Sequence, residues 1–169
     1  MNILVVDGYN IIGAWETLKK AKAREIAEAR DMLIGYMAEY QAYTGDRVII
    51  VFDAYYVHGI ASKRMDSKVE IIYTKEKETA DECIERIVSD LKNVRDQVYV
   101  ATSDYAEQRT IFGRGALRKS ARELYLEWKE SKREMQINIE NHRQLTPQVK
   151  IPLDKETLEI FEKWRRGSR

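Results

Sequence analysis

A run of four apolar residues near the start of the chain, residues 3–6, is followed directly by Asp7. An uninterrupted apolar run of this kind predicts a strand buried on both faces, as at the centre of a parallel sheet. Such a strand places the Asp7 carboxylate at the carboxyl edge of the sheet, where open α/β folds bind ligands. An aspartate can also simply cap the helix that follows, and this pattern alone supports the two interpretations equally.

The same pattern occurs twice more. Residues 47–52 predict a second buried strand that ends on Asp53, and residues 97–103 predict a further strand that leads into Asp104. Between them, residues 69–73 alternate in polarity and predict a more peripheral strand. Because a buried strand does not place a carboxylate at its end without a cost, the repetition indicates a carboxylate site at one edge of a mostly parallel sheet.

A fourth aspartate, Asp81, comes from a helix. Thr79 and Glu82 have the spacing of a capping box, which predicts a helix start with Asp81 in the first turn. A carboxylate in that turn is favourable against the helix macrodipole by a few tenths to ~1 kcal/mol and needs no chemistry. The helix nevertheless begins on the side of the sheet where the strands end, so Asp81 joins the three strand-end aspartates.

Carboxylates gathered at one edge repel one another, and their pKa values rise unless a cation neutralises them. Oxygen ligands with no nearby His or Cys suit Mg²⁺ or Mn²⁺ rather than zinc. A divalent ion held by several aspartates activates water for phosphodiester hydrolysis. We therefore expect a metal-dependent hydrolase whose products carry a 5′-phosphate and a 3′-hydroxyl.

Other chemistries lack their motifs. The sequence has no Gly-rich phosphate loop, no Gly-x-Gly-x-x-Gly after the first strand and no Gly-x-Ser-x-Gly, so neither a nucleotide cofactor nor a serine hydrolase is expected. No apolar run approaches the roughly 18 residues of a membrane span, and the first residues lack the charged region of a signal peptide. We expect a cytoplasmic protein with no membrane partner.

Most of the remaining chain is predicted to be helical. Residues 11–43 have helical character with a break near Lys20, and Gly45 stops the helix. The apolar face of this crossover helix consists of Ile26, Ala29, Leu33, Met37 and Tyr40. A second helix starts at Ser120, with an apolar stripe of Ala121, Leu124, Trp128, Met135 and Ile139.

Basic and aromatic residues suggest where a nucleic acid would bind. The net charge is only +1, but residues 1–108 have net charge −5 and residues 109–169 have net charge +6. In the second part, stepping 100° per residue from Arg118 predicts a basic helical stripe that includes Arg122, Lys129 and Arg133. A solvated face paired with Glu123, Glu127 and Glu130 explains this stripe nearly as well. The long connection at residues 54–68 contains Tyr55 and Tyr56 near cations, which suits stacking on unpaired bases, although an ordinary loop is the simpler interpretation.

The motifs together resemble a known family. They are Asp7-Gly8-Tyr9-Asn10, Val51-Phe52-Asp53, Thr79-Ala80-Asp81 and Ala101-Thr102-Ser103-Asp104, with further matches over residues 112–124 and 162–167. This set resembles the NYN-domain ribonucleases, a branch of the PIN-like nucleases, and specifically the YacP-type endoribonucleases of Gram-positive bacteria. The resemblance implies a PIN-like three-layer α/β fold with a mostly parallel sheet and a C-terminal helical extension. It also implies metal-dependent cleavage of mRNA on the translating ribosome.

The resemblance also assigns residues and domains. By motif, Asp7, Asp81 and Asp104 are the expected metal ligands, and Asp53 and Asn10 belong to the same catalytic set. A further acid from the helix after the first strand is expected, with Glu28, Asp31 and Glu39 as open alternatives. The expected RNA-binding residues are Arg114, Arg118, Lys119, Arg122, Tyr55 and Tyr56. Residues 1–145 would form the nuclease domain, and residues 146–169 a linker and a short basic helix packed on it.

Two other classes remain open. A receiver-type signalling domain is also a parallel α/β fold with an acidic Mg²⁺ site, and Asp53 could be its phosphorylated residue. It would need a fifth strand ending in Lys, which the sequence does not show. A non-catalytic RNA-binding or ribosome-binding module could keep the same fold, although the four aspartates argue against it.

Overall fold

The computed structural model describes residues 2–54, 63–66, 68–91, 96–104, 115–145 and 165. The chain divides into two compact units, residues 1–136 and 137–169, so the first unit ends within the last helix rather than at residue 145. The first unit contains the whole sheet. The expected linker and packed helix at residues 146–169 lie outside the described residues, apart from Arg165.

The sheet of the described residues has six strands. They are β1 (Ile3–Asp7), β2 (Arg47–Phe52), β3 (Lys63–Asp66), β4 (Val69–Tyr73), β5 (Val98–Ala101) and β6 (Leu117–Lys119). The order across the sheet is β3-β4-β2-β1-β5-β6. All neighbouring pairs are parallel except β3 with β4, which are antiparallel.

β1 lies at the centre of this sheet because its sequence suits burial on both faces. All five of its residues are buried, and it pairs in parallel with β2 on one side and β5 on the other. Leu4 and Val6 face one hydrophobic cluster, whereas Ile3 and Val5 face a second. The predicted central strand is confirmed.

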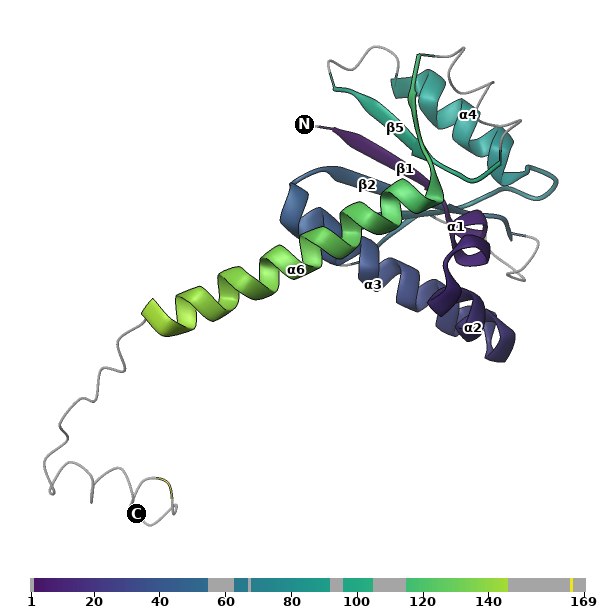
Figure 1. Cartoon of the computed structure of the whole chain (residues 1–169). Coiled ribbons are helices and arrows are strands. Elements are labelled where there is room, and N and C mark those ends of the chain that lie inside the picture. Colours follow the sequence, from purple (N-terminus) through teal and green to yellow (C-terminus); the bar gives the residue numbers. More distant parts are fainter. Residues whose placement is uncertain are drawn as a thin grey trace, which may run out of the picture. The chain divides into compact units, whose positions relative to one another are not determined.

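Helices cover both faces of the sheet. They are α1 (Gly8–Ala14), α2 (Glu16–Arg24), α3 (Ile26–Thr44), α4 (Ala80–Asp90) and α6 (Ala121–Leu145). The first three helices and the start of α6 pack on the face of Leu4 and Val6, and α4 packs on the opposite face (Figure 1). The predicted three-layer α/β architecture with a mostly parallel sheet is confirmed. No helix in the described part of the chain combines the length and hydropathy that a membrane crossing requires.

The helical break expected near Lys20 is wrong. The helix is interrupted instead at Trp15 and Glu25, which both have extended backbone conformations. Trp15 is 3% exposed, and its indole N–H donates to the carbonyl oxygen of Ala121 at 2.8 Å. This contact with α6 holds the chain in a bend that local helical preference would not produce. The predicted stop is correct, since Gly45 has φ +73° at the end of α3.

Two strands were missed. The second half of the connection predicted at residues 54–68 forms β3, and residues 117–119 form β6 beside β5. Arg118 therefore lies in a strand, so the basic stripe counted along one helix from Arg118 is wrong.

Within the predicted apolar stripe of α6, Leu124 and Trp128 are buried, but Ile139 is 53% exposed.

Candidate active site

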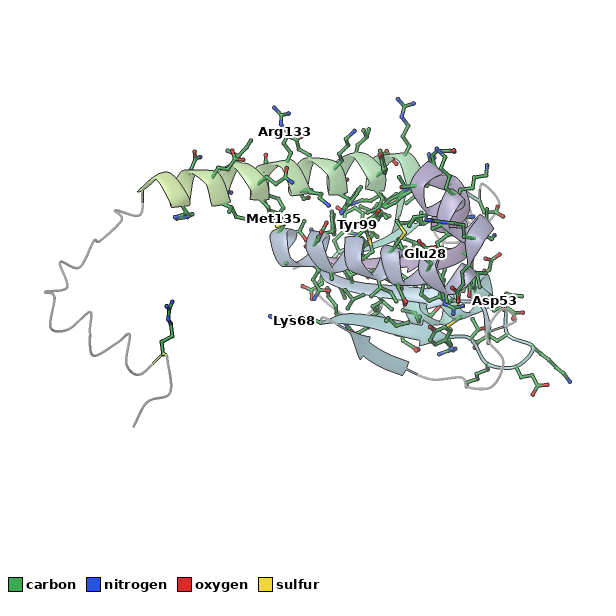
Figure 2. All side chains as sticks on the ribbon, turned by 90° about the horizontal axis from the view of Figure 1, so that it is seen from below. Glu28, Asp53, Lys68, Tyr99, Arg133 and Met135 are labelled. Atoms are coloured by element: carbon green, nitrogen blue, oxygen red, sulfur yellow. The ribbon has the colours of Figure 1, made fainter. Side chains whose placement is uncertain are left out.

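The topology brings the strand-end aspartates to one edge. From β1 the chain passes through α1–α3 to β2 on one side, and later from β4 through α4 to β5 on the other side. Asp7 and Asp104 follow the two strands that flank this reversal, and ligands of open α/β sheets bind at such switch points. Figure 2 shows Asp53 at this end of the sheet and Lys68 at the opposite end.

Asp7 is held as a helix cap and is buried at the same time. Its Oδ1 accepts the backbone N–H of Asn10 at 3.2 Å, which caps α1, and the residue is only 7% exposed. Gly8 permits this tight exit from β1, because a Cβ at Gly8 would overlap the ring of Phe52. The capping interpretation of Asp7 is therefore confirmed, and the same carboxylate lies at the carboxyl edge of the sheet, where open α/β folds bind ligands.

The electrostatics show that the acids lie near one another. The pKa of Asp7 is raised to about 6, first by burial and then by Asp81, Asp104 and Asp53, while the Asn10 hydrogen bond opposes the rise. The pKa of Asp81 is also raised, by partial burial and then by the neighbouring carboxylates, with Asp104 the largest of them. The structure thus brings together four predicted aspartates from β1, β2, α4 and the exit of β5.

Local hydrogen bonds hold these acids in place. The capping box at α4 is complete, with Thr79 Oγ1 accepting the Glu82 N–H at 3.2 Å and the Glu82 carboxylate accepting the Thr79 N–H at 3.0 Å. After β5, the Asp104 N–H donates to Thr102 Oγ1 at 3.1 Å. These bonds use backbone groups, so they fix the acids without neutralising them.

Asn10 has a positioning role in this structure. Its Oδ1 accepts the N–H of Ser103 at 2.6 Å, which ties the start of α1 to the segment that carries Asp104. The same residue donates its N–H to Asp7. Asn10 therefore links the two strand ends on either side of the switch point, and its amide oxygen is already engaged.

The aspartates at this edge offer oxygen donors to a metal ion. Four carboxylates at one edge, two of which (Asp7 and Asp81) have raised pKa values, suit a hard divalent cation in donor chemistry. No group of three or more His, Cys, Asp or Glu side chains within the described residues is arranged so that it could hold a metal ion. The chemistry of the donors fits Mg²⁺ or Mn²⁺, but the arrangement does not form a complete protein cage.

The comparisons with known proteins identify the family. A family model described as a YacP-like NYN domain matches residues 4–166. The chain belongs to this YacP-like NYN family. It is 55% identical over 167 residues to the protein YacP of Bacillus subtilis (strain 168), covering 99% of this chain and 98% of that protein.

Solved structures agree with this family assignment. The crystal structure of Rae1 (YacP) from Bacillus subtilis matches with a TM-score of 0.77 and 55% identity, covering 99% of this chain and 96% of that one. The structure of a tryptophan-to-leucine variant of that protein matches with a TM-score of 0.73 and 52% identity, covering 98% of this chain and 96% of that one. The predicted resemblance is confirmed, and the YacP-like NYN fold supports a nuclease-type function on RNA.

The extra acid expected from α3 stays a prediction for this NYN domain. Glu28 pairs with Arg24 at 2.9 Å, and Glu39 accepts Trp128 Nε1 at 3.3 Å. Asp31 is exposed, and none of these three α3 acids is among the main influences on the pKa of Asp7 or Asp81. An acid outside the predicted set that does raise the Asp81 pKa is Glu85, four residues further along α4. The i, i+4 spacing of Glu85 from Asp81 puts the two acids next to each other on the helix surface, and this spacing could have identified Glu85 from the sequence.

Lys119, one of the predicted RNA-binding residues, is engaged in contacts within the protein. Its ammonium is 2.6 Å from the Glu127 carboxylate and 4.9 Å from the centre of the Tyr99 ring, and its side chain is only 13% exposed. Tyr40 donates its hydroxyl to the same Glu127 carboxylate at 3.0 Å. Lys119 therefore joins β6 to α3 and α6, and its RNA-binding role stays a prediction.

The other predicted RNA-binding residues fall into two groups. Arg118 in β6 and Arg122 in the first turn of α6 are exposed. Arg114, Tyr55 and Tyr56 lie outside the described residues.

A cation that the sequence did not single out is Arg30 of α3. Its guanidinium donates to the Tyr9 hydroxyl at 3.0 Å, and the Tyr9 ring lies 5.1 Å from the ring of Phe52. Burial raises the pKa of Tyr9 and Arg30 opposes the rise, while Tyr73 and Asp53 add to it. Arg30 thus brings a positive charge close to Asp53, which periodicity could not reveal because Arg30 occupies an ordinary polar position of α3.

The receiver-type alternative conflicts with this NYN topology. Contrary to expectation, a fifth parallel strand ending in lysine exists, since β6 ends at Lys119. However, the parallel strands follow the order third-second-first-fourth-fifth, whereas receiver domains have the order 2-1-3-4-5. The Lys119 ammonium is paired with Glu127. A lysine at the end of the fifth parallel strand is therefore not evidence for a receiver domain here.

Proposed function

We propose that this YacP-like NYN protein is a metal-dependent endoribonuclease that cleaves mRNA in association with the translating ribosome. The observation that carries the proposal is Asp7, a buried carboxylate at the switch point of the sheet. Burial, and after it three neighbouring aspartates, raise the Asp7 pKa to about 6. Keeping this buried carboxylate ionised at neutral pH destabilises the folded protein. A bound cation would offset that cost.

The cation is Mg²⁺ or Mn²⁺, held by Asp7, Asp81 and Asp104 with Asp53 beside them. Mg²⁺ often binds through one or two carboxylates and takes its other oxygens from water and substrate phosphate, so the absence of a complete protein cage among the described residues is compatible with it. When bound, such an ion polarises the phosphodiester and lowers the pKa of water. RNA phosphate would then be part of the site and not only its substrate.

The chain's own residues account for the rest of the reaction. The carboxylates fix the place of cleavage, while exposed Arg118 and Arg122 hold neighbouring phosphates. None of these groups engages the 2′-hydroxyl as a nucleophile, so the products carry a 5′-phosphate and a 3′-hydroxyl. A 2′,3′-cyclic phosphate end would contradict this mechanism.

The charge of the protein supports a large partner for substrate selection. Non-specific affinity for RNA rests on phosphate neutralisation, and the net charge of this chain is only +1. Free single strands should therefore bind weakly. Docking on a ribosome would raise the effective concentration of mRNA at the carboxylates without new base contacts.

The test is cleavage of one mRNA by the full-length protein with Mg²⁺ or Mn²⁺. Asp81→Asn should lower the cleavage rate by at least about a hundredfold, because it removes an anionic ligand while keeping the shape of the side chain. Asp90→Asn is the matched control, since Asp90 is an exposed acid at the other end of α4. EDTA should stop the wild-type protein.

Three states of the same mRNA test the ribosome: naked RNA, RNA in a translation system, and RNA in that system with an initiation inhibitor. We expect rapid cleavage only in the second. Equal cleavage in all three would remove the ribosome from the proposal. Binding without cleavage in any state, or an active Asp81→Asn variant, would favour a non-catalytic RNA-binding module or a different active site.

A further inference from the structure

A cavity of about 390 Å³ lies beside the carboxylate edge, and the reaction proposed above does not use it. Its walls come from the bend between α1 and α2, the segment after β5 and the first turns of α6. The volume is within the range of small-molecule sites, which is roughly 300–1,000 Å³. It is therefore large enough to take part of a substrate.

The cavity and the carboxylates share one connected piece of backbone. Ser103 lines the cavity and directly precedes Asp104. The Ser103 N–H donates to Asn10 Oδ1 at 2.6 Å, and the Asn10 N–H donates to Asp7. A group in the cavity is thus placed at a fixed position relative to a phosphate held at the acids.

Aromatic side chains form the apolar wall of the cavity. Trp15 is anchored by its hydrogen bond to Ala121, and its ring lies edge-on to Tyr125 with 5.2 Å between centroids. Trp128 supports Tyr125 from a centroid distance of 5.8 Å. Because Trp15 is 3% exposed and Tyr125 is half-buried, Tyr125 is the wall ring that a flat ligand can reach; the Lys129 ammonium lies over the same ring, 5.9 Å from its centroid.

Charged residues line the cavity as well. Arg122 is exposed there and brings a guanidinium to the same space as Tyr125. Glu16 also lines the cavity, but its carboxylate has a cationic partner in Lys20 at 3.6 Å. An aromatic platform next to a cation is the combination with which proteins bind single-stranded nucleic acid.

We propose that this cavity holds one unpaired nucleobase of the RNA strand that the carboxylates act on, stacked on Tyr125 with Arg122 against the adjoining phosphate. The inference rests on the proposed function and deepens it. Because the base must leave any duplex to enter, the substrate is single-stranded RNA. The cut then falls at a constant distance from the lodged base.

The test uses short single-stranded RNAs with 2-aminopurine at successive positions, bound to the full-length protein in EDTA so that no cleavage is needed. Stacking quenches this fluorescent base, and we expect quenching at one position. Tyr125→Ala should weaken binding of that RNA by about 5- to 150-fold, the range for loss of one base–aromatic stack. Tyr125→Phe should retain both binding and quenching, because it keeps the ring.

A second variant guards against a folding defect in Tyr125→Ala. Ala14 lines the cavity and is exposed, so Ala14→Phe should fill the space and abolish the quenching without disturbing the core. The matched controls are Ala23→Phe on α2 and Leu126→Ala beside Tyr125, since both positions are exposed and neither lines the cavity. Thermal unfolding of each variant verifies the fold.

The outcomes separate this inference from the proposed function. Wild-type quenching and affinity in both Tyr125→Ala and Ala14→Phe, or no quenching at any position, would overturn the base-binding cavity even if RNA is cut with Mg²⁺. Equal binding of a fully paired duplex would overturn it as well. Quenching that both variants abolish, in a protein that never cuts RNA, would uphold the cavity and refute the nuclease.

Discussion

Replacing Asp7 by asparagine should stabilise the protein when no divalent cation is present. Burial and three neighbouring carboxylates raise the Asp7 pKa from its ordinary value of 3.8 to about 6. At pH 7.5 the group is nevertheless ionised, so folding carries a cost of about 3 kcal/mol, at roughly 1.4 kcal/mol for each pKa unit. Asparagine is neutral and remains a good cap, so it can still accept the Asn10 N–H.

The pH dependence has a definite sign. Between about pH 4 and 6 the folded protein keeps a proton on Asp7 that the unfolded chain has lost, so wild-type stability falls as the pH rises through this range. Below about pH 4 both states are protonated at Asp7 and the cost vanishes. The advantage of Asp7→Asn should therefore be near zero at pH 4 and greatest above pH 7.

Urea unfolding in EDTA at pH 4 and pH 7.5 measures this difference directly. At pH 7.5 a gain of about 3 kcal/mol corresponds to a rise in melting temperature of about 6–12 °C for a chain of this size. Asp90→Asn, at an exposed acid, should change little. The reasoning is refuted if Asp7→Asn is no more stable than wild type at pH 7.5, or if its gain is the same at both pH values. Adding Mn²⁺ should then stabilise wild type more than the variant.

Two other predictions concern packing. Gly8→Ala should destabilise the fold by about 1–3 kcal/mol because its Cβ overlaps the Phe52 ring. Gly35→Ala, a helical position with nothing within 4 Å of the added atom, should instead stabilise by up to about 1 kcal/mol in the same urea titration. Lys119→Met should cost up to about 1 kcal/mol, because it removes the cation from a Glu127 side chain that is 44% exposed, and it should leave the salt dependence of RNA binding unchanged. If Lys119→Met instead lowers the slope of log K for RNA binding against log[salt], Lys119 contacts RNA phosphate.

Local patterns predicted the parts of the site that depend on a few neighbouring residues. The apolar run before Asp7 identified the central strand, and the spacing of Thr79 and Glu82 identified the start of α4, since both signals lie within one element. The positions of the acids at one edge followed from the rule that parallel strands share a carboxyl end. The same rule did not give the identity of Glu85, because that acid lies on a helix and not at a strand end.

Long-range contacts explain what the patterns missed. The bend at Trp15 depends on a hydrogen bond to a residue 106 positions away, which no local preference encodes. β6 has the sequence Leu-Arg-Lys, without an apolar run, and it becomes a strand by pairing with β5. Its last residue, Lys119, then lies against Glu127, a contact that no local pattern in this basic segment predicts.

The fold does not need Asp7 to be an acid, and this favours a cation at this edge of the sheet. Its structural task is to cap α1 by accepting the Asn10 N–H, and asparagine does this about as well as aspartate. The acid instead costs about 3 kcal/mol at neutral pH, a large part of the 5–15 kcal/mol by which domains are typically stable. The same edge gathers Asp53, Asp81 and Asp104, each of which raises that cost. A bound divalent ion would turn these repulsions into attractions, so the residue that makes the free protein less stable is the one that the proposed reaction most requires.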